Sequence, residues 1–269
     1  MTIKIIIRII ALLLIIASAV CGLLFVREYK TAQTEILEYS ILRESYTSTG
    51  SFPTQYEFPT ITDPIGASGV SDILDLPKTE VDFESLLRIN PDTMGWINIP
   101  NTKISYPVVQ TVDNHKYLKI SFEGKQSNAG TPFADKGNNM KNLDTNTIIY
   151  GHNMGTGRTD MFGTLLFYMD YEYFTENRFI QFDTIYQNFG WWEVFAVIEF
   201  DVRNTDFNYQ QLAFQNDDDF IDWIAELKAF SIHDVNVDIS PNDRILTLST
   251  CDRSKFGQNG RLLVFAVLN

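Results

Sequence analysis

The sequence predicts a mainly β domain in which short strands close, or nearly close, into a barrel, with peripheral helices and a separate apolar helix at the N-terminus. Beyond residue 95, short runs of β-branched and aromatic residues alternate with turn residues such as Pro100-Asn101 and Asn259-Gly260. The first thirty residues instead contain one long apolar run. A composition of 45 % hydrophobic and 13 % aromatic residues over 269 positions supplies a globular core and argues against a disordered or fibrous protein.

The apolar run predicts one membrane-spanning helix over residues 9–26. These eighteen residues, IIALLLIIASAVCGLLFV, carry no charge, and a hydrocarbon core of about 30 Å needs roughly that length of helix. Lys4 and Arg8 precede the run, and basic residues favour the cytoplasmic side. We therefore expect residues 1–8 in the cytoplasm, a single-pass signal anchor, and the remainder of the chain outside the cell.

Two alternatives exist for this segment. Residues 17–19 (Ala-Ser-Ala) have the small side chains of a signal-peptide cleavage site, but the apolar run continues through Phe25 without the polar break that follows such a site. Lipidation of Cys21 is disfavoured because the bulkier Val20 precedes it. The pattern favours a retained anchor.

The charge of the chain excludes some partners. The formal net charge is −13, and beyond residue 30 the chain holds 17 basic and 33 acidic residues, or −16. Such a domain repels nucleic acid and anionic lipid, so we expect no nucleic-acid partner and contact with the membrane only through the N-terminal helix.

Residues 27–80 are expected to form a stalk and linker. Residues 27–43 have a loosely helical pattern, and residues 44–80 are rich in Ser, Thr, Gly and Pro, which indicates a mostly extended segment. The folded domain is expected to cover residues 81–269, because apolar residues take up helical spacing at residues 81–90 and strand-like runs follow.

Seven strands and two further helices are predicted within this domain. The second helix has three aspartates at its N-terminal end and one apolar face, which indicates a lid packed on the barrel rather than a chemical role. The strands are predicted at residues 96–99, 104–109, 147–150, 179–182, 191–201, 244–249 and 261–268, and the helices at residues 160–168 and 217–230.

A free thiol is the first candidate for chemistry. The chain has two cysteines, and Cys21 lies within the predicted span, so Cys251 is expected to be unpaired. Cys251 ends a strand on its more polar side. Arg261 opens the next strand after a polar nine-residue turn, so antiparallel pairing would make the two residues neighbours. Arg253, inside that turn, is a rival for the role of Arg261.

Of the three histidines, His152 has the most suggestive position, in the loop that leaves the strand at 147–150. A thiol nucleophile needs a partner for its proton and positive charge where an oxyanion develops. Cys251, His152 and Arg261 have these chemical types. Each also has a structural interpretation, as a small buried hydrophobe, a hydrogen-bonded surface residue and a surface ion pair, and spacing alone leaves their proximity open.

Other patterns are weak, and we expect no cofactor and no metal. Three glycines after residue 150 lack the Lys-Ser/Thr of a phosphate loop, and the histidines and cysteines lack metal-ligand spacing. The aspartates at residues 217–219 are explained by a helix start.

Five segments resemble the sortase family of cysteine transpeptidases. Residues 247–251 (TLSTC), 150–153 (YGHN) and 261–264 (RLLV) look like its Cys, His and Arg signatures. Residues 90–97 (NPDTMGWI) and 104–110 (ISYPVVQ) are typical of class B members. The similarity extends from about residue 81 to the C-terminus.

The resemblance implies an eight-stranded sortase-type β-barrel, with the helix at 217–230 matching one that class B enzymes carry before the cysteine strand. It implies that Cys251 attacks a Thr carbonyl in a C-terminal sorting signal and forms a thioacyl enzyme, which an amine of cell-wall peptidoglycan resolves. It assigns proton transfer to His152, and the holding of substrate and oxyanion to Arg261. The implied partners are sorting-signal-bearing surface or pilin proteins and a peptidoglycan precursor or pilin amine.

Two features depart from the class. The segment 44–80 is long, and Phe265 occupies a position where a His is common. The alternatives that remain open are a sortase that polymerises pilins and a non-catalytic, membrane-tethered adhesion or binding module in which Cys251 is structural.

Overall fold

The computed structural model describes residues 2–49, 78–155 and 158–269. Its contacts divide the chain into two compact units, Met1–Ile41 and Leu42–Asn269, which are described separately.

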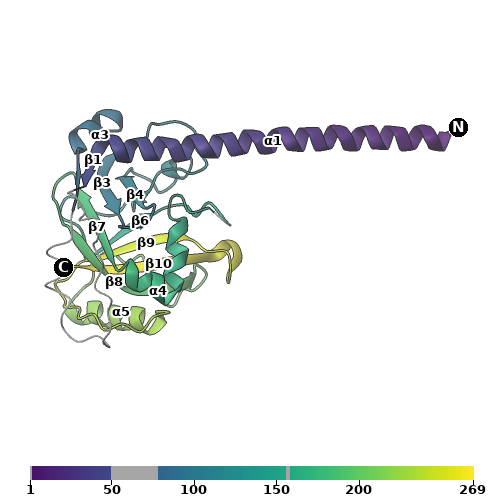
Figure 1. Ribbon diagram of the computed structural model, residues 1–269. Coiled ribbons are helices and arrows are strands. Elements are labelled where there is room, and N and C mark those ends of the chain that lie inside the picture. Colours follow the sequence, from purple (N-terminus) through teal and green to yellow (C-terminus); the bar gives the residue numbers. More distant parts are fainter. Residues whose placement is uncertain (1, 50–77, 156–157) are drawn as a thin grey trace. The chain divides into compact units, whose positions relative to one another are not determined.

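The first unit is formed by the helix α1 (Thr2–Tyr46), whose last five residues belong to the second unit. From Arg8 onwards, α1 is long and apolar enough to cross a membrane. All side chains of residues 9–26 are exposed, so this apolar surface is available to lipid. The helix continues through the expected stalk at residues 27–43 (Figure 1). The N-terminal helix therefore fits a membrane anchor.

The second unit begins with short elements that lead into the barrel. Strands β1 (Thr47–Thr49) and β2 (Thr79–Val81) pair antiparallel. The expected linker at residues 44–80 therefore begins with the last turn of α1 and has a strand near each end, and its residues 50–77 lie outside the described part of the chain. The helix α3 (Phe83–Ile89) follows, with Asp82 Oδ1 accepting a hydrogen bond from the Ser85 amide at 3.0 Å as its N-cap.

Eight strands close into a barrel in the order β10-β8-β7-β3-β4-β5-β6-β9, which confirms the predicted eight-stranded fold (Figure 1). Neighbours pair antiparallel except β4 with β5 and β6 with β9, which are parallel. The strands are β3 (Thr93–Asn98), β4 (Ser105–Val109), β5 (Phe133–Ala134), β6 (Asn146–Tyr150), β7 (Phe179–Thr184), β8 (Trp191–Asp201), β9 (Ile245–Cys251) and β10 (Gly260–Leu268). β5 is too short for sequence periodicity to reveal.

The helix α5 (Asp217–Phe230) packs on β8 and β10 as a lid. Trp223 meets the edge of Phe265, with ring centroids 6.0 Å apart, so the phenylalanine that departs from the class is a packing partner of α5. The apolar cluster under the helix includes Phe195, Phe220, Leu227, Ile245, Leu263 and Val267. Cys251 and Arg261 lie on the same faces of β9 and β10 as Ile245 and Phe265, but beyond the part that α5 covers.

The prediction of a helix at residues 160–168 was wrong in both the type and the position of the element. The structure has a 3₁₀-helix η2 (Gly163–Met169) followed by the α-helix α4 (Tyr171–Glu176). Met161 has a φ of 52°, which an α-helix does not tolerate. Asp170 is extended and caps α4 by accepting a bond from the Tyr173 amide at 3.0 Å, which separates the two helices.

Candidate active site

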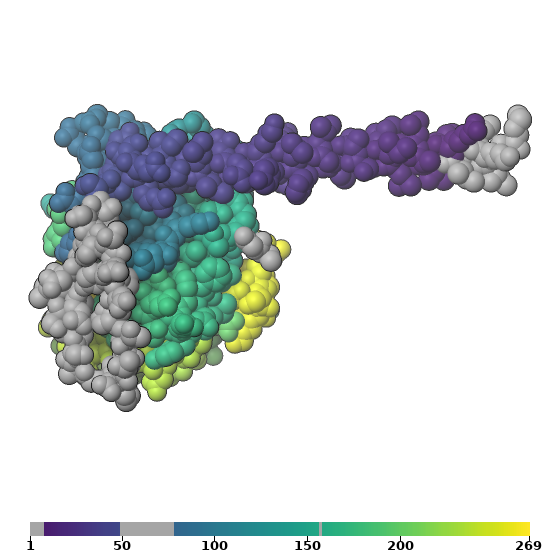
Figure 2. Space-filling view, in the orientation of Figure 1, coloured from purple at the N-terminus to yellow at the C-terminus, as the bar shows by residue number. Residues whose placement is uncertain are grey.

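Cys251 is the last residue of β9, and it is paired directly with Arg261 near the start of β10. Both side chains are half-buried. Since directly paired residues of antiparallel strands project to the same face, the thiol and the guanidinium share one face at the rim of the barrel. The polar turn between the strands, residues 252–259, reaches the surface and appears in yellow in Figures 1 and 2.

The turn that joins these strands is fixed by Asp252 and Gly260. The buried Asp252 carboxylate accepts hydrogen bonds from the Ser254 amide and hydroxyl, both at 2.9 Å. Its amide donates to the Gly260 carbonyl at 3.1 Å. A Cβ at Gly260 would lie 1.9 Å from the Asp252 oxygen, so only glycine fits there. The close approach holds the strand ends, and therefore Cys251 and Arg261, in register.

The parallel pairing of β6 with β9 brings the loop that carries His152 to the end of β9. Tyr150 is paired with Ser249, and the Gly151 amide donates to the Ser249 carbonyl at 3.1 Å. The two strands advance together, so His152 follows β6 at the same end of the barrel at which Cys251 ends β9.

Two side-chain bonds tie the loop of His152 to the cysteine strand. Thr250 Oγ1 donates to the Gly151 carbonyl at 2.8 Å, and Asn153 Nδ2 donates to the Cys251 carbonyl at 2.9 Å. The residue before His152 is thus bonded to the Thr250 side chain, and the residue after it is bonded to the Cys251 backbone. The structure brings together all three predicted residues, with the His152 loop on the β6 side of β9 and Arg261 on the β10 side.

The orientation of the His152 ring is set by the Leu118 carbonyl, whose oxygen lies 2.9 Å from Nε2. A carbonyl oxygen only accepts hydrogen bonds, so Nε2 must carry a proton. In the neutral ring, Nδ1 then remains as the basic nitrogen. Leu118 belongs to the 3₁₀-helix η1 (Lys116–Leu118) in the long connection between β4 and β5.

The pKa of His152 is lowered from its usual 6.5, chiefly because burial penalises the charged ring. The Leu118 carbonyl opposes this shift, and the positive charges of Lys119 and Arg253 add to it. The neutral imidazole is therefore favoured.

Arg261 directs its guanidinium toward the hairpin turn. Its Nη1 donates to the Gln258 carbonyl at 3.1 Å and to the Gly260 carbonyl at 2.8 Å. Both acceptors are neutral main-chain oxygens, so these bonds leave the positive charge of the guanidinium uncompensated. Arg253, the rival arginine, is exposed in the turn, two residues after Cys251 in the sequence.

Sequence reasoning missed Tyr209, which lies in the connection between β8 and α5. Its hydroxyl interacts with Ser249, and burial raises its pKa, an effect that the Ser249 bond and the charge of Arg261 oppose. The negative charge of a Cys251 thiolate, like burial, raises the pKa of Tyr209. Tyr209 is therefore within electrostatic reach of both Cys251 and Arg261. No local pattern in its segment pointed to the site.

Tyr150 was likewise missed, although it directly precedes the Gly-His pair. Its hydroxyl donates to Asp135 Oδ2 at 3.0 Å and accepts from Gln210 Nε2 at 2.8 Å. Burial is the main reason that its pKa is raised. The neutral hydroxyl links β6 to the segment that carries Tyr209, so the two tyrosines extend the polar surface beside the thiol.

The matching protein family is described as the sortase domain, and its model matches residues 97–269. Sortase B of Listeria monocytogenes serovar 1/2a is 37 % identical over 183 residues, which are 68 % of this chain and 72 % of that protein. Sortase B of Staphylococcus aureus is 36 % identical over 184 residues, which are 68 % and 73 % of the two chains.

Solved structures agree with these relatives. A complex of S. aureus sortase B with substrate superposes with a TM-score of 0.62 at 36 % identity, covering 69 % of this chain and 83 % of the other. Sortase B of Clostridium perfringens gives a TM-score of 0.63 at 31 % identity, covering 69 % and 98 %. With the barrel and the Cys-His-Arg arrangement described above, these matches show that the chain belongs to the sortase family of cysteine transpeptidases, with class B sortases as its relatives.

Proposed function

We propose that the chain is a membrane-anchored, class B-like sortase that cleaves a C-terminal sorting signal after threonine and transfers the protein to an amine of cell-wall peptidoglycan. The observation that carries the proposal is the placement of a half-buried thiol between two elements, one bearing an imidazole and the other a guanidinium. Among side-chain combinations, this one supplies a nucleophile, a proton donor and an oxyanion partner.

The reaction divides among the three residues. His152 takes the proton of the Cys251 thiol, the thiolate attacks the threonine carbonyl carbon, and the resulting oxyanion is stabilised by the Arg261 guanidinium. Collapse of this intermediate expels the amine of the following residue, which takes a proton from His152. The acceptor amine then attacks the thioester, gives up a proton to His152, and releases the Cys251 thiolate with a new amide bond.

The cellular arrangement follows from the N-terminal helix. Lys4 and Arg8 keep residues 1–8 in the cytoplasm, and the domain with Cys251 lies outside, where surface proteins and wall precursors meet. The predicted boundaries, with an anchor at 9–26 and a catalytic domain from residue 81, are part of the same proposal.

Intact-protein mass spectrometry tests the proposal. The full chain in detergent is incubated with synthetic peptides that each contain a central threonine, first alone and then with peptidoglycan-derived amines or pilin lysine peptides. We expect a thioacyl adduct on the wild type, no adduct on Cys251→Ala, and an amide product with a wall amine. A product formed only with pilin lysines would replace the wall acceptor, and a folded wild type that forms no adduct with any peptide would favour a non-catalytic binding module.

A further inference from the structure

The tautomer of His152 depends on one backbone carbonyl in an irregular segment. The oxygen of Leu118 lies 2.9 Å from Nε2, and η1 is only three residues long within the connection of residues 110–132 between β4 and β5. A carbonyl in such a connection needs its own support if it is to hold a ring in one orientation, because the connection lacks a continuous ladder of main-chain hydrogen bonds.

Main-chain contacts supply part of that support. The Tyr117 carbonyl accepts the Thr131 amide at 3.0 Å, and Asp113 Oδ1 accepts the amides of His115 and Lys116 at 2.6 and 2.9 Å. Gly130 has a φ of 61°, and a Cβ there would lie 2.3 Å from the Tyr117 oxygen. The two arms of the connection therefore lie against each other at Tyr117.

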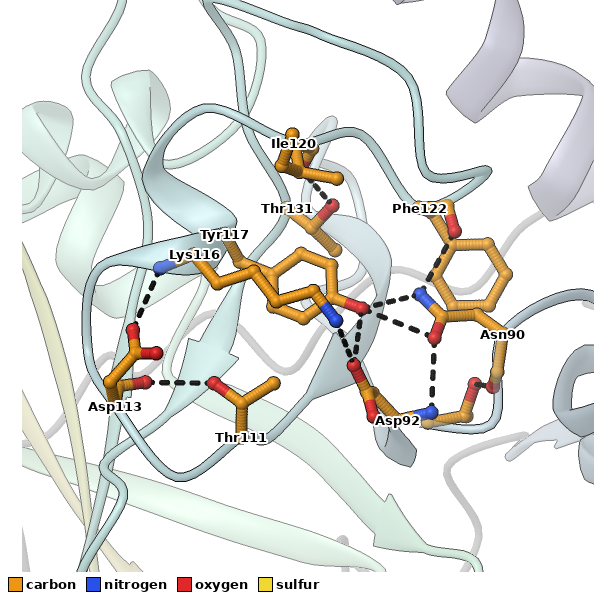
Figure 3. Close-up of polar contacts among 10 residues, drawn as sticks. Asn90, Asp92, Thr111, Asp113, Lys116, Tyr117, Ile120, Phe122 and Thr131 are labelled. Carbon is orange, nitrogen blue, oxygen red and sulfur yellow. Dashed lines mark hydrogen bonds and ion pairs between the residues drawn. The ribbon is translucent and has the colours of Figure 1, made fainter.

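The side chain of Tyr117 ties this segment to the barrel. It is 3 % exposed, and its hydroxyl lies 2.8 Å from Asp92 Oδ2 and accepts from Asn90 Nδ2 at 2.9 Å (Figure 3). The carboxylate is the stronger acceptor, so the hydroxyl proton goes to Asp92. Asn90 Nδ2 also donates to the Phe122 carbonyl at 2.9 Å. Lys116 Nζ lies 2.5 Å from the same Asp92 oxygen (Figure 3).

Asn90 and Asp92 are rigid points of attachment. Asn90 is buried between α3 and β3, and its carbonyl accepts the amide and hydroxyl of Thr93 at 3.1 and 2.6 Å. Asp92 immediately precedes β3, and its carbonyl accepts the Gln110 amide at 2.9 Å, just after β4. The Tyr117 hydroxyl thus joins the segment that contacts His152 to the ends of two barrel strands.

We infer that Tyr117, held by Asn90 and Asp92, is a positioning residue for His152: it fixes the neighbouring Leu118 carbonyl, which keeps the proton on Nε2 and leaves Nδ1 for proton exchange with the Cys251 thiol and the leaving amine. The inference rests on the proposed function, because it gives His152 the role of proton partner. Tyr117 itself makes no contact with the reacting atoms in this scheme. Its effect on the reaction passes through Leu118 and the imidazole.

The direct test is nitrogen NMR of the full chain in detergent with ¹⁵N-labelled histidine, in which the two ring nitrogens of each neutral tautomer have different shifts. His152 is assigned as the signal missing from His152→Ala. We expect the Nε2–H form in the wild type and a mixture of tautomers in Tyr117→Phe, which removes only the hydroxyl. Tyr168→Phe is the matched control, because it removes another buried hydroxyl, bonded to the Asn177 carbonyl at 2.6 Å, and should leave the His152 signal unchanged.

A double-mutant cycle separates positioning from a loss of structure. The probe is the rate of thioacyl formation with the threonine-centred peptides. Tyr117→Phe should lower this rate about tenfold or more in the wild type, and should have little further effect in His152→Ala, because the route through the imidazole is already lost. Asp92→Asn, which keeps the shape of the acceptor but lowers its strength, should give a smaller loss of the same kind.

The outcomes distinguish this inference from the proposed function. If His152→Ala keeps the wild-type rate, the role of His152 in the proposed function is wrong. If His152→Ala is impaired but the effect of Tyr117→Phe is undiminished in that background, or if the wild-type ring is protonated on Nδ1, Tyr117 does not position His152. An unchanged His152 signal in folded Tyr117→Phe would overturn the inference as well.

Discussion

Cys251 and Arg261 are directly opposite each other on adjacent antiparallel strands, at the end of the sheet face that α5 leaves uncovered. The nine intervening residues form a turn fixed by the close contact of Gly260 with the Asp252 carbonyl. The guanidinium is therefore carried by the same hairpin as the thiol. Its position relative to the thiol depends on strand register rather than on a flexible loop.

This pairing predicts that Arg261→Lys impairs catalysis without unfolding the barrel. Lysine keeps the charge but loses the forked donors that bind main-chain oxygens and an oxyanion together. We expect the transition state to lose roughly 3 kcal/mol of stabilisation, so that thioacyl formation becomes about a hundredfold slower. The circular dichroism spectrum should be unchanged.

Arg253→Ala is the matched control for the arginine assignment. Arg253 is exposed in the hairpin turn, so its removal should change the rate only mildly. Near-normal turnover in folded Arg261→Lys, together with a large loss in Arg253→Ala, would show that the roles of the two arginines are reversed.

The half-buried ring of His152 predicts a titration below its usual pKa of 6.5, because partial burial penalises the charged form. Removing the positive charge in Arg253→Ala should move this pKa upward, but it should stay below 6.5 because burial is the larger cause. Proton NMR of the histidine rings over a pH series measures both values, with His152→Ala for assignment. A wild-type value above 6.5 would contradict the burial argument.

The same shift predicts a direction for stability. Since the pKa of His152 is lower in the folded chain than in the unfolded chain, the unfolded chain binds more protons in the interval between the two values. The contribution of this group to stability is present above pH 6.5 and is lost as the pH falls through the folded-state value. Urea unfolding across this interval should show a weaker pH dependence in His152→Ala than in the wild type.

Local sequence patterns anticipated the parts of the site that are close in the chain. Runs of β-branched residues marked β9 and β10, and the polar turn between them placed Arg261 beside Cys251. The helix predicted at residues 217–230 is α5. These features depend on side-chain alternation and turn chemistry, which act over a few residues.

Other parts of the site depend on contacts between distant segments. His152 comes alongside Cys251 only because β6 and β9 pair in parallel across about a hundred residues, and periodicity does not report strand partners. Leu118 contributes a backbone atom, so no side-chain motif marks it. Tyr209 belongs to a connection without regular structure, and its place beside Ser249 follows from the loop's attachment to β6.

The exposed apolar surface of α1 predicts that an N-terminal deletion makes the protein soluble. Removing residues 1–30 takes away the apolar run, while every strand of the barrel remains. We expect a folded, monodisperse domain that forms the same thioacyl adduct as the full chain in detergent. N-terminal sequencing of the native membrane fraction checks whether the anchor is retained, and a mature terminus near residue 20 would contradict that expectation.

The last prediction concerns Asn146, which connects β6 to the segment that carries Tyr209. Its buried amide donates to the carbonyls of Tyr209 and Gln211 at 3.0 and 2.9 Å, and its Oδ1 accepts the Thr247 hydroxyl at 2.7 Å. Asn146→Ala leaves three buried polar groups without this partner. At about 1 kcal/mol for each lost bond, the free energy of unfolding should fall by about 3 kcal/mol.

A control and a second readout make this prediction specific. Asn142 is exposed, so Asn142→Ala should change the free energy of unfolding by less than about 0.5 kcal/mol. Because the Tyr209 segment lies beside Cys251, Asn146→Ala should also slow thioacyl formation under conditions in which the variant remains folded, whereas Asn142→Ala should not. Urea unfolding and adduct mass spectrometry on the same samples measure both effects. Tyr209 also packs edge-on against Phe200, with 5.1 Å between ring centroids, and both belong to the apolar cluster on β8 and α5. A loss of less than about 1 kcal/mol in Asn146→Ala would therefore mean that these apolar contacts, and not the hydrogen bonds of Asn146, hold the segment beside the thiol.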